Sequence, residues 1–517
     1  MKESLKFLIT LIIFSFLLSS TDAIYGQSNE NHPSDEEIYQ GLNLIYNLRF
    51  EEAEQTFKTL QAKYPYDVKS YFYESLIYFY RAIMTGDEQL YEKFLELSEN
   101  VINKCEDILD DDDNNIEILF YKGQAHSYRS LLMLNLNKSL FRAAINGNSG
   151  YRILSEVIER NPEFYDAYMG LGLYKIALGF VPNSFRWLLS IIGFDGNIKD
   201  GLSYLRTSME KGKFTKVDSK VYLAIFSIRE REERDKESVK LIKSLYVQYP
   251  ESPIFKLMYA GFLQQIGEVE ESIRITKDAL RFNDHSLKEE VTKSAFGILG
   301  NAYFRKNDFR KTIEVLEAYL KFVKDDDKYN VVYFTIGSCY ELLGDRETAL
   351  KNYRMVRDKF INERDGEGEK LFYRYAMENI KEPIDEYDSI LVVGMNLRES
   401  NYWEESLSVL SSLRRSKLTE KYNTDDDKIR LYYELGNVYL YMDYFTEAKK
   451  CFEICVALHP QREKWLVPHS YFELGKLYIK LYNKEKAEEM FDKISEYSDY
   501  DMETLLEMRL ASFKERM

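Results

Sequence analysis

The residue types best suited to catalysis or metal binding are histidine and cysteine, and in this chain their spacing matches none of the common motifs. The five histidines are scattered, and none stands in an H-E-x-x-H or similar metal-binding spacing. They are His32, His126, His285, His459 and His469. The chain also lacks a G-x-x-x-x-G-K-S/T phosphate-binding loop and a G-x-S-x-G nucleophile elbow. We therefore predict that the protein is not an enzyme and holds no cofactor and no metal.

The four cysteines are too few for a disulfide framework in a chain of 517 residues. Cys451 and Cys455 lie four residues apart on a predicted helix, Cys339 lies on another helix, and Cys105 stands in a different region. Cys455 falls where the helix pattern requires a small residue, so we interpret it as a buried apolar side chain. A disulfide in an exported compartment or a reactive thiol stays the alternative.

Three acidic runs have the composition of a calcium site, but their positions favour helix caps. The run Asp110–Asp113, followed by Asn114 and Asn115, lacks the alternating ligands and the closing Glu of an EF-hand. The runs Asp325–Asp327 and Asp425–Asp427 each precede a predicted helix, where carboxylates satisfy open backbone N–H groups. We predict solvated helix caps at all three runs.

One sparse pattern recurs along the chain and predicts the helices that must carry these residues. A Gly or small residue is followed about a dozen residues later by Ala, Ser or Thr, and four residues further on by an aromatic residue or Leu. A plain example is Gly436, Ala448 and Phe452. This spacing resembles the tetratricopeptide repeat of about 34 residues. The resemblance implies an all-α fold, a right-handed superhelical solenoid of stacked helix-turn-helix pairs, whose concave face is left for a binding partner.

The low content of Pro and Gly, 9 and 24 residues, favours one continuous helical array over domains joined by flexible linkers. The segment Asp365–Gly368 is the best candidate for a flexible joint. We divide the chain into six parts. They are a signal peptide (1–26), N-terminal repeats with insertions (34–215), central repeats (216–361), a helical connection (362–386), C-terminal repeats (387–501) and a capping helix (502–517).

The first residues have the pattern of a secretory signal. Lys2 and Lys6 are basic, Phe7–Leu18 is an apolar run, and Ser19–Ala23 is a polar exit with small residues. The apolar run is shorter than the ~20 residues that a membrane-spanning helix needs, which disfavours an uncleaved anchor. We expect export to the periplasm, the cell envelope or the extracellular space.

An apolar insertion separates two helices of the N-terminal repeats and carries a second, sharper resemblance. The motif residues are Gly170–Tyr174, Pro182, Leu188–Ile192, Gly193–Gly196 and Gly201–Leu202, and the tail adds Tyr500–Glu503 and Arg509. They resemble the tetratricopeptide repeat protein 39 family, which includes fungal inclusion-body-clearance relatives. The resemblance implies a helical fold and a role in protein interaction, and it supplies no catalytic residues. Members of that family are intracellular, so the predicted signal peptide argues against transferring their cellular role.

The insertion has two interpretations that the sequence leaves open. Its side chains either pack inside the superhelix and brace it, or form an exposed patch for a lipid surface or a protein partner. The residues concerned are Pro182, Trp187, Ile191 and Phe194 within Phe180–Phe194. We favour bracing, because Arg186 alone offers a basic anchor for a membrane surface.

The charge of the chain narrows the class of partner. A formal net charge of −16 works against nucleic acid, whose binding needs clustered Lys and Arg. By repeat register, ten helix residues face the predicted groove and offer amide and lysine donors beside aromatic walls. They are Asn301, Phe304, Phe334, Ser338, Tyr433, Asn437, Tyr441, Phe472, Lys476 and Lys480. We predict an exported, non-enzymatic scaffold that binds a protein or peptide. A lipid or membrane-surface binding protein is the alternative, and the oligomeric state is left open.

Overall fold

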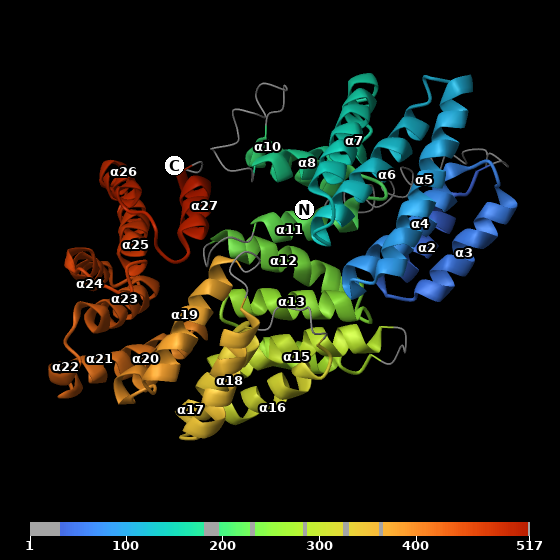
Figure 1. Ribbon diagram of the computed structural model, residues 1–517. Helices are drawn as coiled ribbons and strands as arrows, with labels where there is room; N and C mark the ends of the chain where they lie inside the picture. Colours follow the sequence, from blue (N-terminus) through green and yellow to red (C-terminus); the bar gives the residue numbers. More distant parts are fainter. Residues whose placement is uncertain are drawn as a thin grey trace, which may run out of the picture. The chain divides into compact units, whose positions relative to one another are not determined.

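The computed structural model describes residues 32–179, 196–227, 233–282, 287–323, 330–360 and 366–514, and every regular element in these ranges is a helix (Figure 1). The fold is therefore the predicted all-α solenoid. Several sequence features lie outside the described residues. They are the signal peptide (1–26), the insertion with Pro182, Trp187, Ile191 and Phe194, His285, and the run Asp325–Asp327. The chain divides into two compact units, Met1–Lys216 and Val217–Met517.

The first unit is built from helices that pack against their neighbours in the sequence. They are α2 (Asp35–Tyr46), α3 (Phe50–Lys63), α4 (Val68–Thr85), α5 (Glu88–Asp111), α6 (Ile116–Asn135), α7 (Leu140–Arg160), α8 (Ala167–Gly179) and α10 (Ile198–Lys211). Helix α10 is the delayed partner that the sequence predicts for α8. A Cβ atom added at Gly172 of α8 would lie 2.8 Å from the carbonyl oxygen of Gly201 of α10. The absence of a side chain at Gly172 therefore allows the two backbones to approach this closely.

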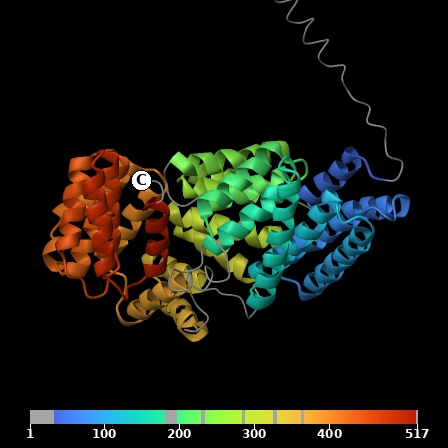
Figure 2. The same cartoon turned by 90° about the horizontal axis from the view of Figure 1, so that it is seen from above.

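The second unit contains the remaining helices. They are α11 (Lys216–Ser227), which begins at the division, α12 (Glu233–Gln248), α13 (Pro253–Gln265), α14 (Val269–Ala279), α15 (Lys288–Arg305), α16 (Phe309–Leu320), α17 (Asn330–Leu342), α18 (Arg346–Lys359), α19 (Glu367–Lys381), α20 (Glu386–Glu399), α21 (Trp403–Arg415), α22 (Leu418–Lys421), α23 (Asp425–Tyr441), α24 (Phe445–Ala457), α25 (Leu466–Lys480), α26 (Lys484–Lys493), the 3-10 helix η1 (Ile494–Glu496) and α27 (Glu503–Lys514). The pairs from α20 to α26 stack in sequence order (Figure 2). Gly366 and Gly368, expected at a flexible joint, are the N-cap and a first-turn residue of α19.

The recurring sequence pattern is a packing rule between the two helices of a pair. A Cβ atom at Gly475 of α25 would lie 2.2 Å from the ring of Phe491 of α26. At Gly436 of α23, the corresponding distance to the ring of Phe452 of α24 is 2.7 Å. The aromatic ring of the second helix thus fills the space that a side chain on the first helix would take, which is why the pattern couples a small residue to a large one.

In seven helix pairs of the described chain, a residue with a left-handed backbone marks the turn at one fixed position. It follows the small residue of the first helix by seven positions. These turn residues are Leu48 (φ 60°), Gly267 (80°), Asn307 (58°), Gly344 (87°), Asn401 (62°), Asp443 (59°) and Tyr482 (56°). Gly and Asn adopt this conformation at low cost, whereas Tyr does so with strain.

We predict that Tyr482→Asn stabilises the protein. Tyr482 has a left-handed backbone and a side chain that is 99% exposed, so it carries strain without burying its ring. We expect the free energy of unfolding to rise by about 0.5–1 kcal/mol, measured by urea denaturation. Tyr66→Asn is the control, because Tyr66 is 90% exposed but is not among the left-handed residues. A loss of stability in the Tyr482 variant would contradict the prediction.

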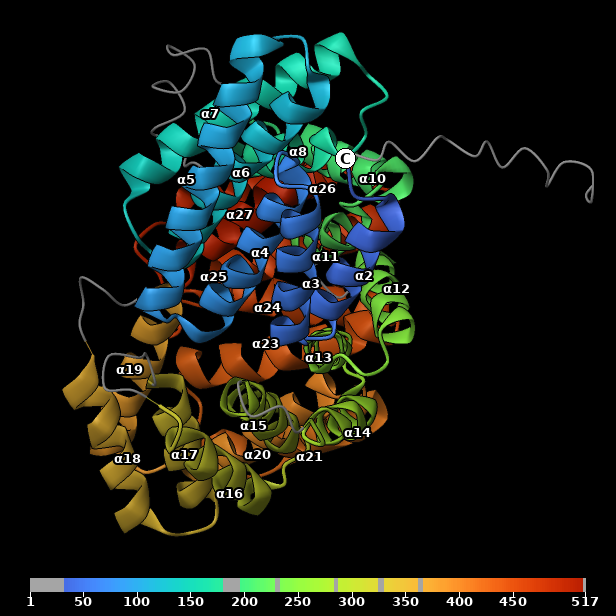
Figure 3. The same ribbon diagram turned by 90° about the vertical axis from the view of Figure 1, so that its right-hand side faces the viewer.

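In the second unit, helix α20 brings the C-terminal pairs next to the central pairs. Asn396 Nδ2 donates to the carbonyl of Phe304 at 2.8 Å, and Asn401 Nδ2 donates to the carbonyl of Ile266 at 2.7 Å. Both carbonyl groups lie at the ends of central helices, beside the turns of their pairs. Helices α15 and α20 accordingly lie side by side (Figures 1 and 3).

Candidate functional site

The first helices of the last three pairs, α20, α23 and α25, form a surface that we call the inner face. Its residues are Asp388, Arg398, Arg430, Tyr433, Glu434, Asn437, His469, Phe472, Glu473 and Lys476. Arg430 Nη1 of α23 donates to Asp388 Oδ1 of α20 at 2.6 Å. Arg398 Nε of α20 donates to Glu434 Oε2 of α23 at 2.7 Å. Burial alone lowers the pKa of Arg398, but Glu434 and Glu399 raise it well above its usual value, so this bridge between helices stays ionised.

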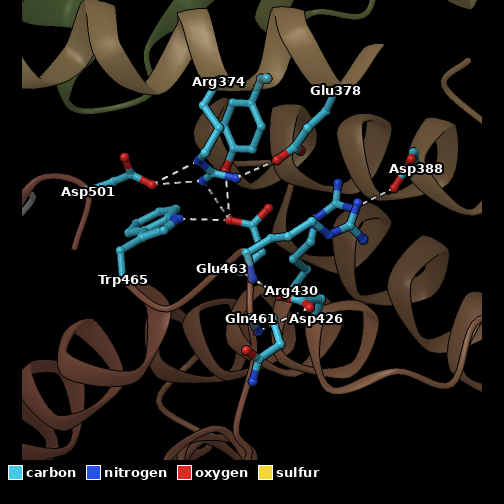
Figure 4. A network of polar contacts seen from close by, with 11 residues as sticks. Arg374, Glu378, Asp388, Asp426, Arg430, Gln461, Glu463, Trp465 and Asp501 are labelled. Atoms are coloured by element: carbon cyan, nitrogen blue, oxygen red, sulfur yellow. Dashed lines mark hydrogen bonds and ion pairs between the residues drawn. The ribbon is translucent and has the colours of Figure 1, made fainter. Parts of the chain in front are cut away.

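A buried carboxylate, Glu463, joins the loop before α25 to helix α19 (Figure 4). Glu463 is 4% exposed. Its Oε2 accepts hydrogen bonds from Trp465 Nε1 at 2.8 Å and from Tyr375 OH at 3.0 Å. Arg374 Nη2 lies 3.3 Å from the same oxygen, and Arg374 Nε donates to Asp501 Oδ2 at 3.0 Å. Arg374 therefore ties α19 both to this loop and to the segment before α27.

Burial and neighbouring charges determine the protonation states of Arg374 and Tyr375 in this network. Burial lowers the pKa of Arg374, but Glu463, Tyr375, Asp501 and Glu378 raise it above its usual range. Burial, with Glu463 second, raises the pKa of Tyr375, so its hydroxyl stays a donor. The network contains an always-charged guanidinium held by three carboxylates, an arrangement that suits a structural tie better than proton transfer.

Asp426 holds the same loop from the side of α23. Its carboxylate accepts hydrogen bonds from three consecutive backbone N–H groups, those of Gln461 at 3.2 Å, Arg462 at 2.8 Å and Glu463 at 2.8 Å. Asp426 is 8% exposed, so these bonds are largely shielded from water. The position of Glu463 is thus set by its backbone as well as by its carboxylate.

The two other carboxylates of this acidic run, Asp425 and Asp427, have different roles. Asp427 forms a capping box with Thr424 at the N-terminus of the helix, which confirms the predicted cap. Asp425 Oδ2 instead accepts the backbone N–H of His459 at 2.8 Å. One carboxylate therefore caps its own helix, while two others hold the loop before the next pair, so the predicted cap is wrong for Asp425 and Asp426.

The last helix of the chain, α27, covers part of the inner face. Phe513 packs against Phe472 of α25 and Phe491 of α26, with ring centroids 5.9 Å and 5.6 Å apart. The guanidinium of Arg509 lies 4.8 Å from the ring centroid of Phe472, and its Nη2 is 3.7 Å from Glu473 Oε1. The aromatic and acidic side chains of α25 are therefore occupied by the chain's own C-terminal helix.

His469 lies on the same part of α25 and is 4% exposed. Its Nε2 has no hydrogen-bond partner in the described part of the chain. Its ring meets Trp465 edge to face, with centroids 5.0 Å apart. Burial, with Arg509 second, lowers the pKa of His469 to about 3, so the imidazole is neutral at physiological pH. A buried polar atom left without a partner is unfavourable, and it gains a hydrogen bond if a suitable ligand atom arrives.

Comparison with known proteins agrees with the helix-pair geometry. The model of the family described as Iml2/Tetratricopeptide repeat protein 39 matches residues 166–351, and the tetratricopeptide repeat model matches residues 429–462 and 468–499. Tetratricopeptide repeat protein ttc-39B of Caenorhabditis elegans is 23% identical over 556 residues, which cover 94% of this chain and 93% of the relative. The chain is a tetratricopeptide repeat protein related to tetratricopeptide repeat protein 39. Proteins built from these repeats generally act as protein-interaction scaffolds.

Solved structures of other proteins are also similar to the chain. A tetratricopeptide repeat protein from Parabacteroides merdae is 14% identical, covers 57% of this chain and 99% of its own, and has a TM-score of 0.23. The human IFIT1 dimer with PPP-AAAA is 14% identical, covers 90% of this chain and 96% of its own, and has a TM-score of 0.28.

Six of the ten predicted groove residues of this repeat protein lie on α23 and α25, and three of them are buried. Phe472 packs beneath Phe513, and Lys476 Nζ lies 3.0 Å from Glu473 Oε2. Asn437 Nδ2 donates to the carbonyl of Tyr433 at 2.9 Å within its own helix. The expected open groove is therefore wrong for the exposure of Phe472, Lys476 and Asn437, because packed side chains, including those of α27, cover them.

The other groove residues of the C-terminal pairs differ in exposure. Tyr433 is half-buried between Phe452 and Trp465. Tyr441 is half-buried and stacks on Trp403, with centroids 5.9 Å apart and planes 11° from parallel. Lys480, at the end of α25, is exposed. Among these six residues, Lys480 is thus the one whose side chain reaches solvent freely.

Four predicted groove residues lie on the central helices α15 and α17. Asn301 is exposed. Phe304 is half-buried against Phe309. Phe334 packs on Phe372 of α19 with centroids 5.3 Å apart, and Ser338 is buried. A partner-binding role for the ten residues stays a prediction.

Sequence reasoning missed the residues that tie the inner face together: Arg374, Glu463, Asp501 and Arg509. Arg374 is 89 residues from Glu463 and 127 residues from Asp501 in the sequence. These positions lie in loops and on α19 and α27, outside the recurring pattern of small and aromatic residues that predicts the helix pairs. Asp501 and Arg509 were noticed only through the resemblance of the tail to a family, which gave them no partner.

The four cysteines are buried and free, as the structural interpretation requires. Burial raises the pKa of Cys451 to about 11 and the pKa values of Cys105 and Cys339 to about 12. These thiols therefore stay protonated and weakly nucleophilic at physiological pH. Burial also raises the pKa of Cys455, which confirms its interpretation as a buried side chain.

The arrangement of the described residues provides neither metal-binding nor membrane-spanning features. No three His, Cys, Asp or Glu residues within the described ranges gather in a way that could hold a metal ion. Over the same ranges, no helix combines the length and the apolar character needed to cross a membrane. In the first unit, Asn115 caps α6, which confirms the predicted cap for this residue, whereas Asp110 and Asp111 are the last residues of α5.

Proposed function

We propose that this protein is an exported, non-enzymatic scaffold that binds a segment of a partner protein at the inner face of its C-terminal helix pairs. The observation that carries the proposal is the pairing of His469 Nε2, buried without a hydrogen-bond partner, with the aromatic wall of Phe472 and Trp465. Binding sites are commonly lined by apolar and aromatic side chains with a few polar groups that fix the orientation of the bound molecule. Helix α27 on the same surface is an example of a segment that fits it.

Export is supported by the sequence of residues 1–26, with its basic start, apolar run and small-residue exit. The N-terminal sequence of the protein purified from its native source tests this part of the proposal directly. Loss of about the first 26 residues would support export, and an intact N-terminus on soluble protein would contradict it.

The class of partner is a protein or peptide. The net charge of −16 disfavours nucleic acid. We do not extend the lipid-binding alternative, because residues 180–194 lie outside the described part of the chain.

Site-specific photo-cross-linking tests the binding face. Lys480 lies on the inner-face register of α25 and is exposed. We expect p-benzoylphenylalanine at position 480 to cross-link a partner protein in the native cell fraction. The control is the same probe at Lys351, an exposed residue on α18, the second helix of its pair. Cross-links from position 351 and not from position 480 would place the partner on the opposite surface and contradict the proposal.

A further inference from the structure

The buried apolar side chains of α27 share one side of the helix. Leu506 and Phe513 are buried in a cluster with Phe472 and Phe491. On the other side, Leu505 and Met508 are exposed. The helix therefore contributes two apolar anchors, seven residues apart, to the surface beneath it.

Charged contacts fix the direction of α27 on this surface. At its start, Glu367 of α19 accepts the backbone N–H groups of Thr504 at 3.0 Å and Leu505 at 3.3 Å. Halfway along, Arg509 lies against Phe472 and Glu473. The receiving surface is thus acidic at two places and aromatic between them. It matches a helix that presents open N–H groups at its first turn and a basic residue one turn later.

The connection that leads into α27 is strained. Asp499 has a φ of 58° and Met502 a φ of 64°, and neither residue is Gly or Asn. A left-handed Met is an outlier in proteins. The strain is relieved when α27 and this connection detach from the surface beneath them. Backbone strain thus favours release of α27, whereas the buried side chains favour its retention.

We propose that the surface beneath α27 is a docking site for a helix of a partner protein, and that α27 occupies this site until the partner's helix replaces it. The recognised pattern is that of α27, an apolar residue followed three positions later by Arg and seven positions later by Phe. The identity of the surface as the partner site rests on the proposed function, whereas the exchange of α27 is measured independently of any native partner. The buried imidazole of His469 lies at the same surface and offers a ring nitrogen to an incoming polar group.

A peptide of residues 499–517, labelled with a fluorophore, tests the exchange in the full-length chain. Arg509→Glu places a carboxylate against Glu473 and loosens α27 in its own chain. We expect the Arg509→Glu chain to bind the wild-type peptide at least tenfold more tightly than the wild-type chain does, as measured by fluorescence anisotropy. The matched control is Glu507→Arg, which changes charge on an exposed side chain of α27 and should leave peptide binding at the wild-type level.

Recognition of the pattern is tested by exchanging the charges. A peptide with Arg509→Glu should not bind the Arg509→Glu chain, but it should bind a chain that carries Glu473→Arg alone, in which the chain's own Arg509 faces a like charge. A folded Arg509→Glu chain that takes up no wild-type peptide would overturn the proposal. Peptide uptake with no native cross-link at position 480 would contradict the proposed function and leave the exchange standing.

Hydrogen exchange of the unmodified chain provides a measurement that no folding defect can obscure. We expect the amides of α27 to exchange at least tenfold faster than those of α25. A helix that detaches exposes its own amides, while the helices beneath it stay folded. Equal, slow exchange in α27 and α25 would show that α27 is a permanent part of the fold, which would overturn the proposal.

Discussion

Asp426→Ala is expected to lower the free energy of unfolding of the C-terminal pairs by about 3 kcal/mol. The substitution removes one carboxylate but leaves three backbone N–H groups, those of residues 461–463, without an acceptor. Hydrogen bonds to a charged group contribute about 1.5–3 kcal/mol each, and relaxation of the loop toward water recovers part of the loss. Urea denaturation followed by circular dichroism measures the change. We also expect the tie between Glu463 and Arg374 to loosen, because the backbone of Glu463 is no longer fixed.

Two variants make this prediction specific. Asp426→Asn keeps an oxygen where Oδ1 accepts Arg462 and Glu463, each at 2.8 Å, so it should cost less than half as much as Asp426→Ala. Asp110→Ala removes an exposed carboxylate from another acidic run and should change stability by less than about 0.5 kcal/mol. Equal effects of Asp426→Ala and Asp110→Ala would show that Asp426 affects stability only through the net charge of the protein and not through its hydrogen bonds.

The helix pairs could be predicted from sequence because their packing rule is local. Gly475 and Phe491 are 16 residues apart, and the contact between their helices follows from one turn of fixed geometry. The same locality explains why Asp427 could be recognised as a helix cap. Each of these features is decided by neighbours within one repeat, so a repeating pattern is enough to reveal it.

The role of Asp426 could not be predicted from its neighbours in the sequence. Its neighbours in the sequence suggest a helix cap, yet its partners lie 35 to 37 residues away in the loop before the next pair. Asp166 behaves in the same way in the first unit, where it accepts the N–H groups of Phe214 and Thr215. Carboxylates at a helix start are alike in sequence, whether they cap their own helix or hold another segment.

The exposure of the predicted groove residues could not be derived from repeat register. Register places Phe472 and Lys476 correctly on the first helix of their pair. Phe472 packs against α27, whose connection and left-handed Met502 lie outside the repeat pattern. Closure of the inner face also requires Arg374, from a helix that carries no recognisable repeat signature. Non-local side-chain ties of this kind leave no periodic signal in a single sequence.

The stability of the C-terminal pairs should fall below pH 6.5 because of His469. Its pKa is lowered to about 3 by burial, whereas the pKa of an unfolded histidine is about 6.5. As the pH falls below 6.5, the unfolded chain binds a proton at this residue and the folded chain does not. Stability is therefore fully present above pH 6.5 and is lost progressively toward pH 3. Between pH 6.5 and 4.5, this residue alone should cost about 2–3 kcal/mol.

His469→Phe separates this effect from the titration of other groups. Phe keeps a ring against Trp465 but cannot take up a proton, so the variant should lose less stability than the wild type between pH 6.5 and 4.5. His459→Phe is the matched control, because it makes the same substitution at an exposed histidine. Parallel curves for the wild type and His469→Phe would mean that the imidazole is protonated in the folded chain. That outcome would require a partner for Nε2 at low pH, and it would remove the unpartnered polar atom on which the proposed binding at the inner face depends.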